Sequence, residues 1–316
     1  MQTDTNPSPN LNPRTAAEPG RPGPLSSAAL VFFGGACYGF NATCFKIAFG
    51  MGFSSAQIAA AQVWASFTLF GLLFAVGLLR GRRWVRLGRA TAAKLFLAGC
   101  TTCLTSIFYT YAMSVLPMSL ALTLLFQFTW VGTLIQTLMT RRPPAASQVV
   151  SALITVLGTV FASGLYKTDL STCDPTGIAA GLVAAVCCAL FLTMSGRTKT
   201  ECPQAQRGLV ICAGSVAASH LICPDFIVSG VLLRGIAPLG LVAGTCGFFL
   251  PVLLFSIGTP QLPTGLTTIL AAAELPAGLL VGMLVLAEPV GPVEWLGVAI
   301  ILVGVCVSQP QFLRKR

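Results

Sequence analysis

A single carboxylate, Glu274, lies near the centre of a long apolar stretch, residues 264–288. Helical residues rise about 1.5 Å each, so such a stretch can cross a hydrocarbon core of about 30 Å. An ionisable group at that depth costs roughly 2.5–3.5 kcal/mol or more, and it is normally tolerated only where it faces a bundle interior or a wet cavity. Pro276 follows two residues later and removes a backbone donor, which predicts a kink beside the acid. Acid and kink together indicate a functional site.

Two kinds of role are open to this acid. Burial favours the neutral form of a carboxyl group, so Glu274 could bind and release a proton, or attract a cationic group of a solute. A neutral carboxyl hydrogen-bonded to a neighbouring helix would instead be a structural contact. Bends are expected at Pro276 and at Gly247 with Pro251, which could serve as gates, although the spacing of Gly240, Gly244 and Gly247 also suits plain helix packing.

Other polar side chains within apolar stretches are candidates to bind a solute. Tyr38 and Asn41 are three residues apart and therefore share a helix face, and Gln127 and Trp130 have the same spacing. An amide and an indole on one face would suit an amino-acid-like or aromatic ligand. Lys46 could pair with a solute carboxylate or extend its amine to the lipid headgroups. Each of these residues could also simply bridge helices.

Composition sets the fold class. Of 316 residues, 55% are hydrophobic and only 9% are charged, and the apolar runs recur with short polar breaks. This pattern is typical of an all-α polytopic membrane protein without a soluble domain. Residues 1–25 are expected to form a disordered tail and residues 309–316 a short basic tail. Hydropathy predicts ten transmembrane helices, at residues 26–48, 54–79, 92–113, 118–139, 147–165, 176–195, 207–224, 237–257, 264–285 and 290–308.

The formal charge of +10 comes from basic clusters between the apolar spans. They lack the aromatic interleaving that stacks bases, so no nucleic-acid partner is expected. If both termini are cytoplasmic, most of the basic residues lie inside, and Lys167 and Arg234 lie outside. The positive-inside rule favours this orientation, in the plasma (inner) membrane. Tyr109 and Tyr111 lie near the outer end of their helix, and at least one should anchor at the interface.

The chain also contains a weak internal repeat. Moving residues 116–163 forward by 146 positions sets Leu116-Pro117 on Leu262-Pro263, Pro143 on Pro289 and Gly158 on Gly304. The two copies are residues 26–165 and 176–308, and because five helices separate them, they cross the membrane in opposite senses. Two inverted five-helix repeats are typical of transporters, in which similar halves exchange roles as inner and outer gate.

Local motifs extend this pattern to a known family. The segment GFNATCFKIA, with Gly39 and Lys46, the block LPMSLALTLLFQFTWVGTLIQTLM and the block LPTGLTTILAAAELPAGLLVGMLVLAEPVGPVEWLG resemble EamA-type members of the drug/metabolite transporter superfamily. The resemblance covers residues 26–308. It implies export or exchange of small metabolites, amino acids or amphipathic drugs through a cavity lined by helices one, three, four, six, eight and nine.

The first half departs from the family pattern. Trp130 occupies the position that matches Pro276, Arg142 occupies the one that matches Glu288, and Gln62 stands where many relatives have an arginine. These departures make the first half unusual, so the identity of the solute does not follow from the resemblance.

The leading hypothesis is a secondary transporter, an exporter by alternating access that uses Glu274 and could be coupled to protons. A lipid flippase or a non-transporting membrane scaffold is the alternative. An enzyme is not expected, because catalysis needs a base or metal beside a nucleophile and His220 is the chain's one histidine. No cofactor or metal is expected. The expected partners are a small-molecule substrate, membrane lipid and a second copy in a homodimer, with Gly297 and Gly304 on a scaffold or dimer surface. Cys173 and Cys223 could form a disulfide on the outer side.

Overall fold

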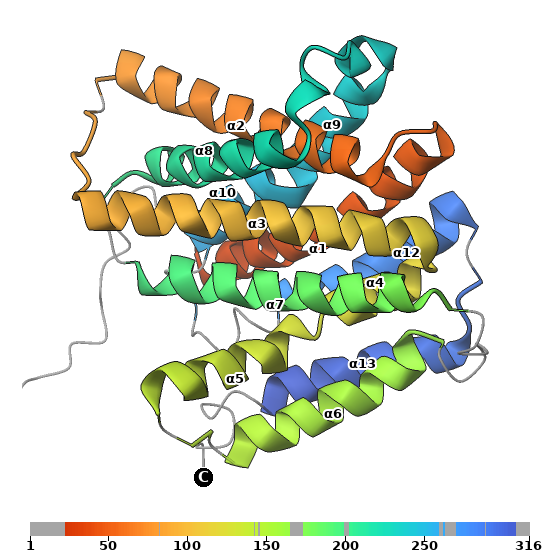
Figure 1. Cartoon of the computed structure of the whole chain (residues 1–316). Coiled ribbons are helices and arrows are strands. Elements are labelled where there is room, and N and C mark those ends of the chain that lie inside the picture. The colour runs from red at the N-terminus through yellow and green to blue at the C-terminus, as the bar shows by residue number, and fades with distance from the viewer. Residues whose placement is uncertain are drawn as a thin grey trace, which may run out of the picture.

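The computed structural model describes residues 23–81, 83–141, 143–144, 146–164, 173–198, 202–258, 262, 270–287 and 289–307. The predictions for Pro263, Lys167, Arg142 and Glu288, and for both terminal tails apart from residues 23–25, lie outside this part. The described chain is helical and contains no strand (Figure 1). The protein is a multi-pass helical membrane protein, since six segments are long and apolar enough to cross a bilayer. They are Leu25–Gly50, Ser55–Leu79, Arg89–Val115, Met118–Met139, Pro175–Ser195 and Ile236–Phe255, and the shorter apolar helices are Val149–Ala162, Glu274–Leu286 and Pro292–Val307.

The described helices lie close to the predicted spans. Two spans are interrupted by breaks, and a third contains a π-helical turn. In chain order they are α1 (Pro24–Gly50), α2 (Ser55–Leu79), α3 (Arg89–Val115), α4 (Met118–Leu125), α5 (Phe128–Thr140), α6 (Ala146–Ala162), α7 (Pro175–Arg197), α8 (Gln204–Ile222), α9 (Ile236–Gly244), the π-helical turn η4 (Thr245–Phe249), α10 (Leu250–Gly258), α12 (Glu274–Leu286) and α13 (Pro292–Val307), with two short 3₁₀ turns, η2 (Pro224–Phe226) and η3 (Val231–Arg234), between α8 and α9.

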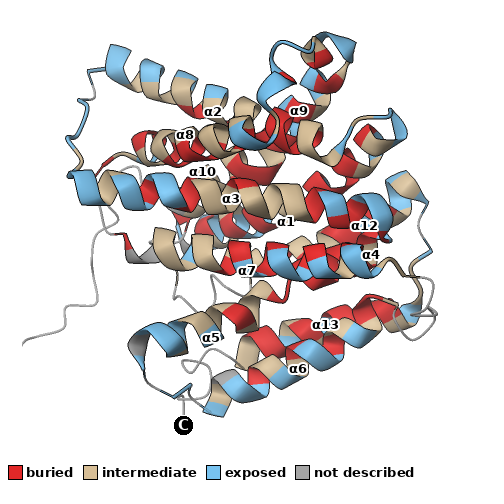
Figure 2. Ribbon diagram, in the orientation of Figure 1, coloured by how far each residue is buried: buried red, intermediate tan, exposed pale blue. Residues whose placement is uncertain are grey.

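The pattern of buried and exposed residues differs from that of a water-soluble protein. Figure 2 shows the buried residues on the faces that the helices turn toward one another and the exposed residues on the outward faces. Large apolar side chains are among the most exposed, including Leu138 at 70%, Leu153 at 66% and Leu284 at 75%. Such exposure is expected where lipid, and not water, surrounds the helices.

Two predicted spans are interrupted rather than continuous. Residues 118–139 break at Phe126–Gln127, between α4 and α5, and the ninth span breaks at Ala272–Ala273, before α12. The expected distortion is therefore a two-residue turn that interrupts the helix just before the proline, rather than a kink at Pro276 itself. Pro276 lies in the first turn of α12, where a missing N–H has no intrahelical acceptor to lose.

The two interrupted helices match in register along the chain. Each break lies 146 positions from the other, and the helices that follow end at Arg141 and Ala287, two non-glycine residues with nearly the same left-handed backbone, φ 52° and φ 53°. The next helices, α6 and α13, also begin 146 positions apart, at Ala146 and Pro292. The same offset of 146 positions thus relates a helix break, a helix end and the next helix start.

Helices that are distant in sequence pack against one another. α6 packs against α13, α1 packs against α12 and α10, and α3 packs against α7 and α8 (Figure 1). Gly297 and Gly304 of α13 face α6, where a Cβ atom would overlap Ala162 and crowd Thr155. Their role is therefore packing inside the molecule, and the expected dimer surface does not lie at these glycines. Cys173 and Cys223 are free thiols.

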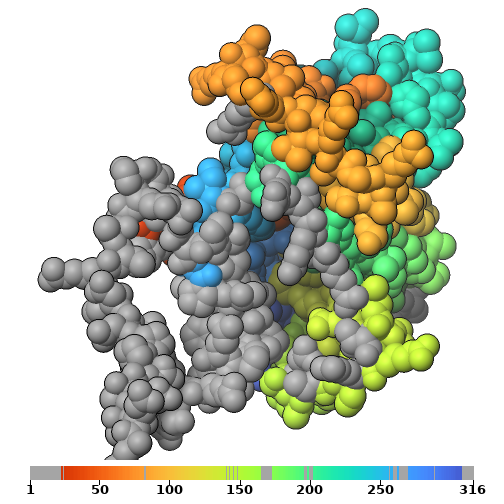
Figure 3. Space-filling model, turned by 90° about the vertical axis from the view of Figure 1, so that its left-hand side faces the viewer, coloured from red at the N-terminus to blue at the C-terminus, as the bar shows by residue number. Residues whose placement is uncertain are grey.

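The helix connections gather at two ends of the bundle. The α2–α3 and α5–α6 connections lie together at one end, the left side of Figure 1, and the α1–α2 and α12–α13 connections lie at the other. Figure 3 shows the first end, where the α2–α3 segment (orange) and the α5–α6 segment (lime) reach the surface. Arg80, Arg83, Arg86 and Arg89 belong to the first end, and Arg234 belongs to the second. The basic residues thus separate along the bundle axis as the sequence predicts, whereas the compartment that each end faces stays a prediction.

Candidate functional site

Glu274 is the first residue of α12 and follows directly on the break at Ala272–Ala273. The positive end of the α12 dipole therefore lies beside its carboxylate. The side chain is partly buried, and no described residue forms a hydrogen bond or ion pair with it. Its charge acts on side chains from three other helices, Tyr38 of α1, Tyr109 of α3 and Cys188 of α7. An unpaired acid is thus enclosed by helices from both halves of the chain.

Close contact between α1 and α12 fixes the position of this acid. A Cβ atom on Gly39 would overlap the backbone of α12 at Glu274 and Gly278, and one on Gly35 would overlap the carbonyl of Ala271. Only glycine lets the two backbones approach this closely. The glycine that the sequence marked in the first helix therefore sets the distance between α1 and the acid-bearing break.

Two buried polar atoms, one on α1 and one on α3, lack partners among the described residues. Asn41 is 7% exposed and its Oδ1 accepts no hydrogen bond, and Tyr109 is 6% exposed and its hydroxyl has no partner. The Tyr109 ring packs edge-on against Phe45, with 6.1 Å between ring centroids. A buried polar group without a partner costs about 1–3 kcal/mol, so such groups point to a binding site or to ordered water.

Tyr109 is a residue that sequence reasoning missed. Both tyrosines of α3 were expected near the outer end, with at least one as an interfacial anchor. Tyr111 fits that expectation, because it is 37% exposed and its hydroxyl lies 3.0 Å from Oγ1 of Thr176. Tyr109 turns inward instead. Its spacing of two from Tyr111 was the available signal, since residues two apart on a helix point in different directions.

Gln127 and Trp130 lie at the other helix break and bind each other. The Trp130 indole donates to Gln127 Oε1 at 2.7 Å, and Gln127 Nε2 donates to the carbonyl of Thr123 at 3.0 Å and to Oγ1 of Thr159 at 2.7 Å. Gln127 is 5% exposed. Its amide is therefore fully engaged in bracing α4, α5 and α6. Direct binding of a solute by these two residues stays a prediction.

Lys46 has a protein partner close by. Its ammonium donates to the carbonyl of Leu116 at 2.7 Å, just beyond the end of α3. The last carbonyls of a helix have no intrahelical donors and carry partial negative charge, so a lysine there both satisfies and stabilises the helix end. This contact ties α1 to the connection between α3 and α4.

Gly247 and Pro251 form a distorted segment. Residues Thr245–Phe249 make a π-helical turn just before Pro251, which has no N–H to continue the regular ladder. A Cβ atom on Gly247 would overlap the side-chain amides of Asn41 and Gln62. Gln62 in turn accepts from Ser106 Oγ at 2.6 Å, which joins α1, α2 and α3 to the π turn. The expected bend is present in the structure, and its gating role stays a prediction.

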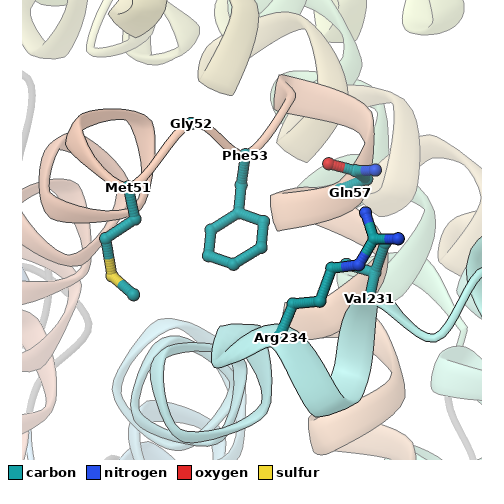
Figure 4. A pocket seen from close by; sticks show the side chains of 6 residues that line it. All are labelled: Met51, Gly52, Phe53, Gln57, Val231 and Arg234. Atoms are coloured by element: carbon teal, nitrogen blue, oxygen red, sulfur yellow. The ribbon is translucent and has the colours of Figure 1, made fainter.

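A separate opening lies at the end of the bundle where α1 meets α2. It has a volume of about 240 Å³ and is lined by Met51, Gly52, Phe53, Gln57, Val231 and Arg234. In Figure 4 the Phe53 ring faces the opening, and the Arg234 side chain extends toward Gln57. This opening lies at the far end of α1 from residue 24, and the sequence did not predict it.

Comparison with known proteins finds similarity to an exporter over part of the chain. No family model matches the chain. It is 28% identical over 201 residues to the threonine/homoserine exporter RhtA of Escherichia coli strain K12, and equally to that of strain O157:H7. The match covers 61% of this chain and 64% of the exporter, so the chain spans less than two thirds of the curated relatives' length. The chain is a distant homologue of an exporter. This similarity agrees with the resemblance to the drug/metabolite transporter superfamily that the sequence motifs carry.

The likeness in fold extends further along the chain. A solved crystal structure, titled only as that of a protein, matches with a TM-score of 0.61 at 18% identity and covers 92% of this chain and 99% of its own. At that identity the match concerns the fold alone. The RhtA relative is a transporter and not an enzyme, in agreement with the class that the sequence favours.

Proposed function

We propose that the chain is a secondary transporter that exports small amino-acid-like solutes by alternating access, with Glu274 at the central site. The observation that carries the proposal is a carboxylate at a helix break that has no partner among the described residues and interacts with side chains of α1, α3 and α7. Intramembrane acids without a structural partner mark solute or ion paths in membrane proteins. Similarity to the threonine/homoserine exporter RhtA supports both export as the direction of transport and an amino acid as the class of solute.

Two inverted five-helix repeats, residues 26–165 and 176–308, supply the moving parts of this proposal. The matched breaks, the matched left-handed helix ends at Arg141 and Ala287, and the matched starts of α6 and α13 support such a repeat. In inverted-repeat transporters, discontinuous helices form the site and the two halves rock around it. Here α12 supplies the break that carries the acid, and α4–α5 supplies its counterpart.

The chemistry of the site suits an ammonium group. Glu274 offers a carboxylate, and the rings of Tyr38 and Tyr109 lie within reach of its field, an arrangement that attracts cations by charge and by the aromatic face. Asn41 Oδ1 and the Tyr109 hydroxyl could hydrogen-bond to the rest of a polar solute. The carboxylate can hold either the ammonium group of the solute or a proton. Exchange of one for the other would couple export to proton entry.

The test uses purified full-length protein in liposomes loaded with threonine. We expect the wild-type protein to exchange internal for external radiolabelled threonine, and Glu274→Gln to lose this exchange. Asp225→Asn is the matched control, because Asp225 is an exposed acid in η2 outside the helices. Labelled lipid in the same vesicles reports scrambling. A wild-type protein that scrambles lipid but exchanges no amino acid would overturn the proposal in favour of a flippase.

A further inference from the structure

The connection between α2 and α3 carries a second feature that solute transport does not use. Arg80, Arg83, Arg86 and Arg89 form an arginine patch, defined by these four residues. All four are exposed, and within the described residues none of the four guanidinium groups donates a hydrogen bond or forms an ion pair. Arg207 on α8 contrasts with them, since its guanidinium donates to the carbonyl of Thr198 at 3.1 Å and to Oγ of Ser195 at 3.0 Å. In the described part of the chain, therefore, no acid neutralises these four charges.

The protein holds this connection in a fixed position. Gln206 at the start of α8 is 0% exposed, and its amide pairs with both backbone groups of Val85. The Val85 N–H donates to Gln206 Oε1 at 3.1 Å, and Gln206 Nε2 donates to the Val85 carbonyl at 2.6 Å. Leu87 packs into the apolar cluster of Phe70 and Ile211. With Val85 and Leu87 anchored, the neighbouring arginines are presented outward.

Trp84 places the patch at a membrane surface. Its ring is 51% exposed and packs edge-on against Phe74 of α2, with 5.2 Å between ring centroids. The flanking helices, α2 and α3, are both candidate membrane spans, so their connection lies where lipid headgroups begin. Indole rings prefer that interface, and guanidinium groups bind phosphate oxygens in pairs.

We propose that the arginine patch and Trp84 form a binding surface for the phosphate headgroups of anionic phospholipids in the adjacent leaflet. Basic residues that only set the orientation of the protein in the membrane need no fixed positions. Here the hydrogen bonds from Gln206 to Val85 hold the connection, and with it the arginines, in a defined arrangement. Each arginine near an anionic surface contributes about fivefold in affinity, equivalent to ~1 kcal/mol, and salt screens the attraction. This proposal is independent of the transport activity, because none of its residues lies near Glu274 in the chain or borders the break.

The test measures lipid retained by the full-length protein in native mass spectrometry, after exchange into mixed phosphatidylcholine and phosphatidylglycerol. We expect the wild-type protein to retain phosphatidylglycerol preferentially, Arg86→Gln to weaken this preference about fivefold, and Arg83→Gln/Arg86→Gln to weaken it further. Arg234→Gln removes a charge at the opposite end, and Arg141→Gln removes one at the same end but on another connection. Both controls should retain the wild-type preference.

Three results would overturn the proposal. One is wild-type retention of phosphatidylglycerol by the double variant. A second is an equal loss in Arg141→Gln and Arg86→Gln, which would indicate diffuse attraction rather than a surface. The third is displacement of the retained lipid by inorganic phosphate at matched ionic strength, which would indicate a site for soluble phosphate. Gln206→Ala keeps every charge but releases Val85, so a weakened preference in that variant supports the fixed arrangement, and an unchanged one contradicts it.

Discussion

The two interrupted helices have matching backbones, but their polar side chains differ. The side chain at one break is fully hydrogen-bonded, and the one at the other break, within the described part of the chain, is not. At the α4–α5 break, Gln127 binds Thr123, Thr159 and Trp130, so every polar group of its amide is engaged. At the break before α12, Ala273 occupies the matching position and Glu274 follows it without a hydrogen bond to any described residue. One break is braced by its own side chains, and the other presents an acid.

This difference separates two tasks that one repeated backbone performs. An engaged amide stabilises the break in the first half, because leaving its partners unsatisfied would cost free energy of folding. Glu274 has no partner among the described residues, and an intramembrane acid of this kind is suited to bind a solute or a proton. We therefore assign the first break to support and the second to binding, and the variants of Glu274 and Gln127 below test that assignment directly.

The largest effect is expected for Glu274→Gln. The variant keeps the shape of the side chain but removes the charge, so a bound ammonium group would lose a charged hydrogen bond of about 1.5–3 kcal/mol. Exchange of threonine should fall about 10- to 150-fold, and its dependence on pH should disappear. Radiotracer exchange in liposomes at several pH values measures both. If the variant still exchanges threonine in a pH-dependent manner, Glu274 takes no part in the mechanism.

A large loss of stability is expected for Gly39→Ala. The added methyl group overlaps the α12 backbone at Glu274 and Gly278, and backbone cannot turn aside as a side chain can. We expect a loss of about 2–3 kcal/mol, within the range for overpacked cores. The matching position in the second half is Ala185, where a Cβ atom is already accommodated. Ala185→Gly is the control and should cost only about 0.5–1 kcal/mol in unfolding experiments.

A smaller effect on stability, with exchange preserved, is expected for Gln127→Met. Methionine has a similar volume but leaves the Trp130 indole and Thr159 without their amide partner. We expect unfolding to become easier by about 1–2 kcal/mol, while the apparent affinity for threonine stays unchanged. If affinity falls and stability does not, Gln127 contacts the solute, as the sequence alone suggested.

The smallest effect is expected for Asp174→Asn, which changes the N-cap of the first helix in the second half. Asp174 caps α7 by accepting from the backbone N–H of Thr176 at 2.8 Å, whereas Gly23 at the start of α1 offers no side-chain cap. The hydroxyl and backbone of Thr176 lower the pKa of Asp174, so its ionised form stabilises the fold at neutral pH. That stabilisation should fade as the pH drops below about 4. Asp174→Asn keeps a capping side chain but cannot ionise, so its melting temperature should lose this component of pH dependence.

Hydropathy predicted the long helices well because lipid imposes length and composition directly. The expected span 54–79 corresponds to α2 at Ser55–Leu79, and the predicted separation of basic residues matches the two ends of the bundle. The break at Phe126–Gln127 could not be predicted. Residues 118–139 contain no glycine or proline at the break, which depends instead on an amide that reaches Thr159 on another helix. The matching of the two breaks, in contrast, follows the weak repeat that the sequence contains.

The candidate residues also fall into those that composition reveals and those that depend on helix packing. Glu274 could be found from composition, because a lone acid in an apolar stretch is conspicuous. The inward position of Tyr109 and the contact of Lys46 with Leu116 depend on how α1 and α3 are rotated in the bundle. A uniformly apolar helix gives little indication of which face turns inward. The role of Gln206 was hidden for a similar reason, since its partner Val85 is distant in sequence.

The most direct test of the central claim is chemical labelling of Glu274 itself. A hydrophobic carbodiimide reacts with protonated carboxyl groups in apolar surroundings, and peptide mass spectrometry identifies the modified residue. We predict that Glu274 is modified, that the modification slows as the pH rises, and that saturating threonine suppresses it, while Gln127→Met leaves this protection intact. Modification that proceeds equally with and without solute would contradict the assignment of Glu274 to the binding site.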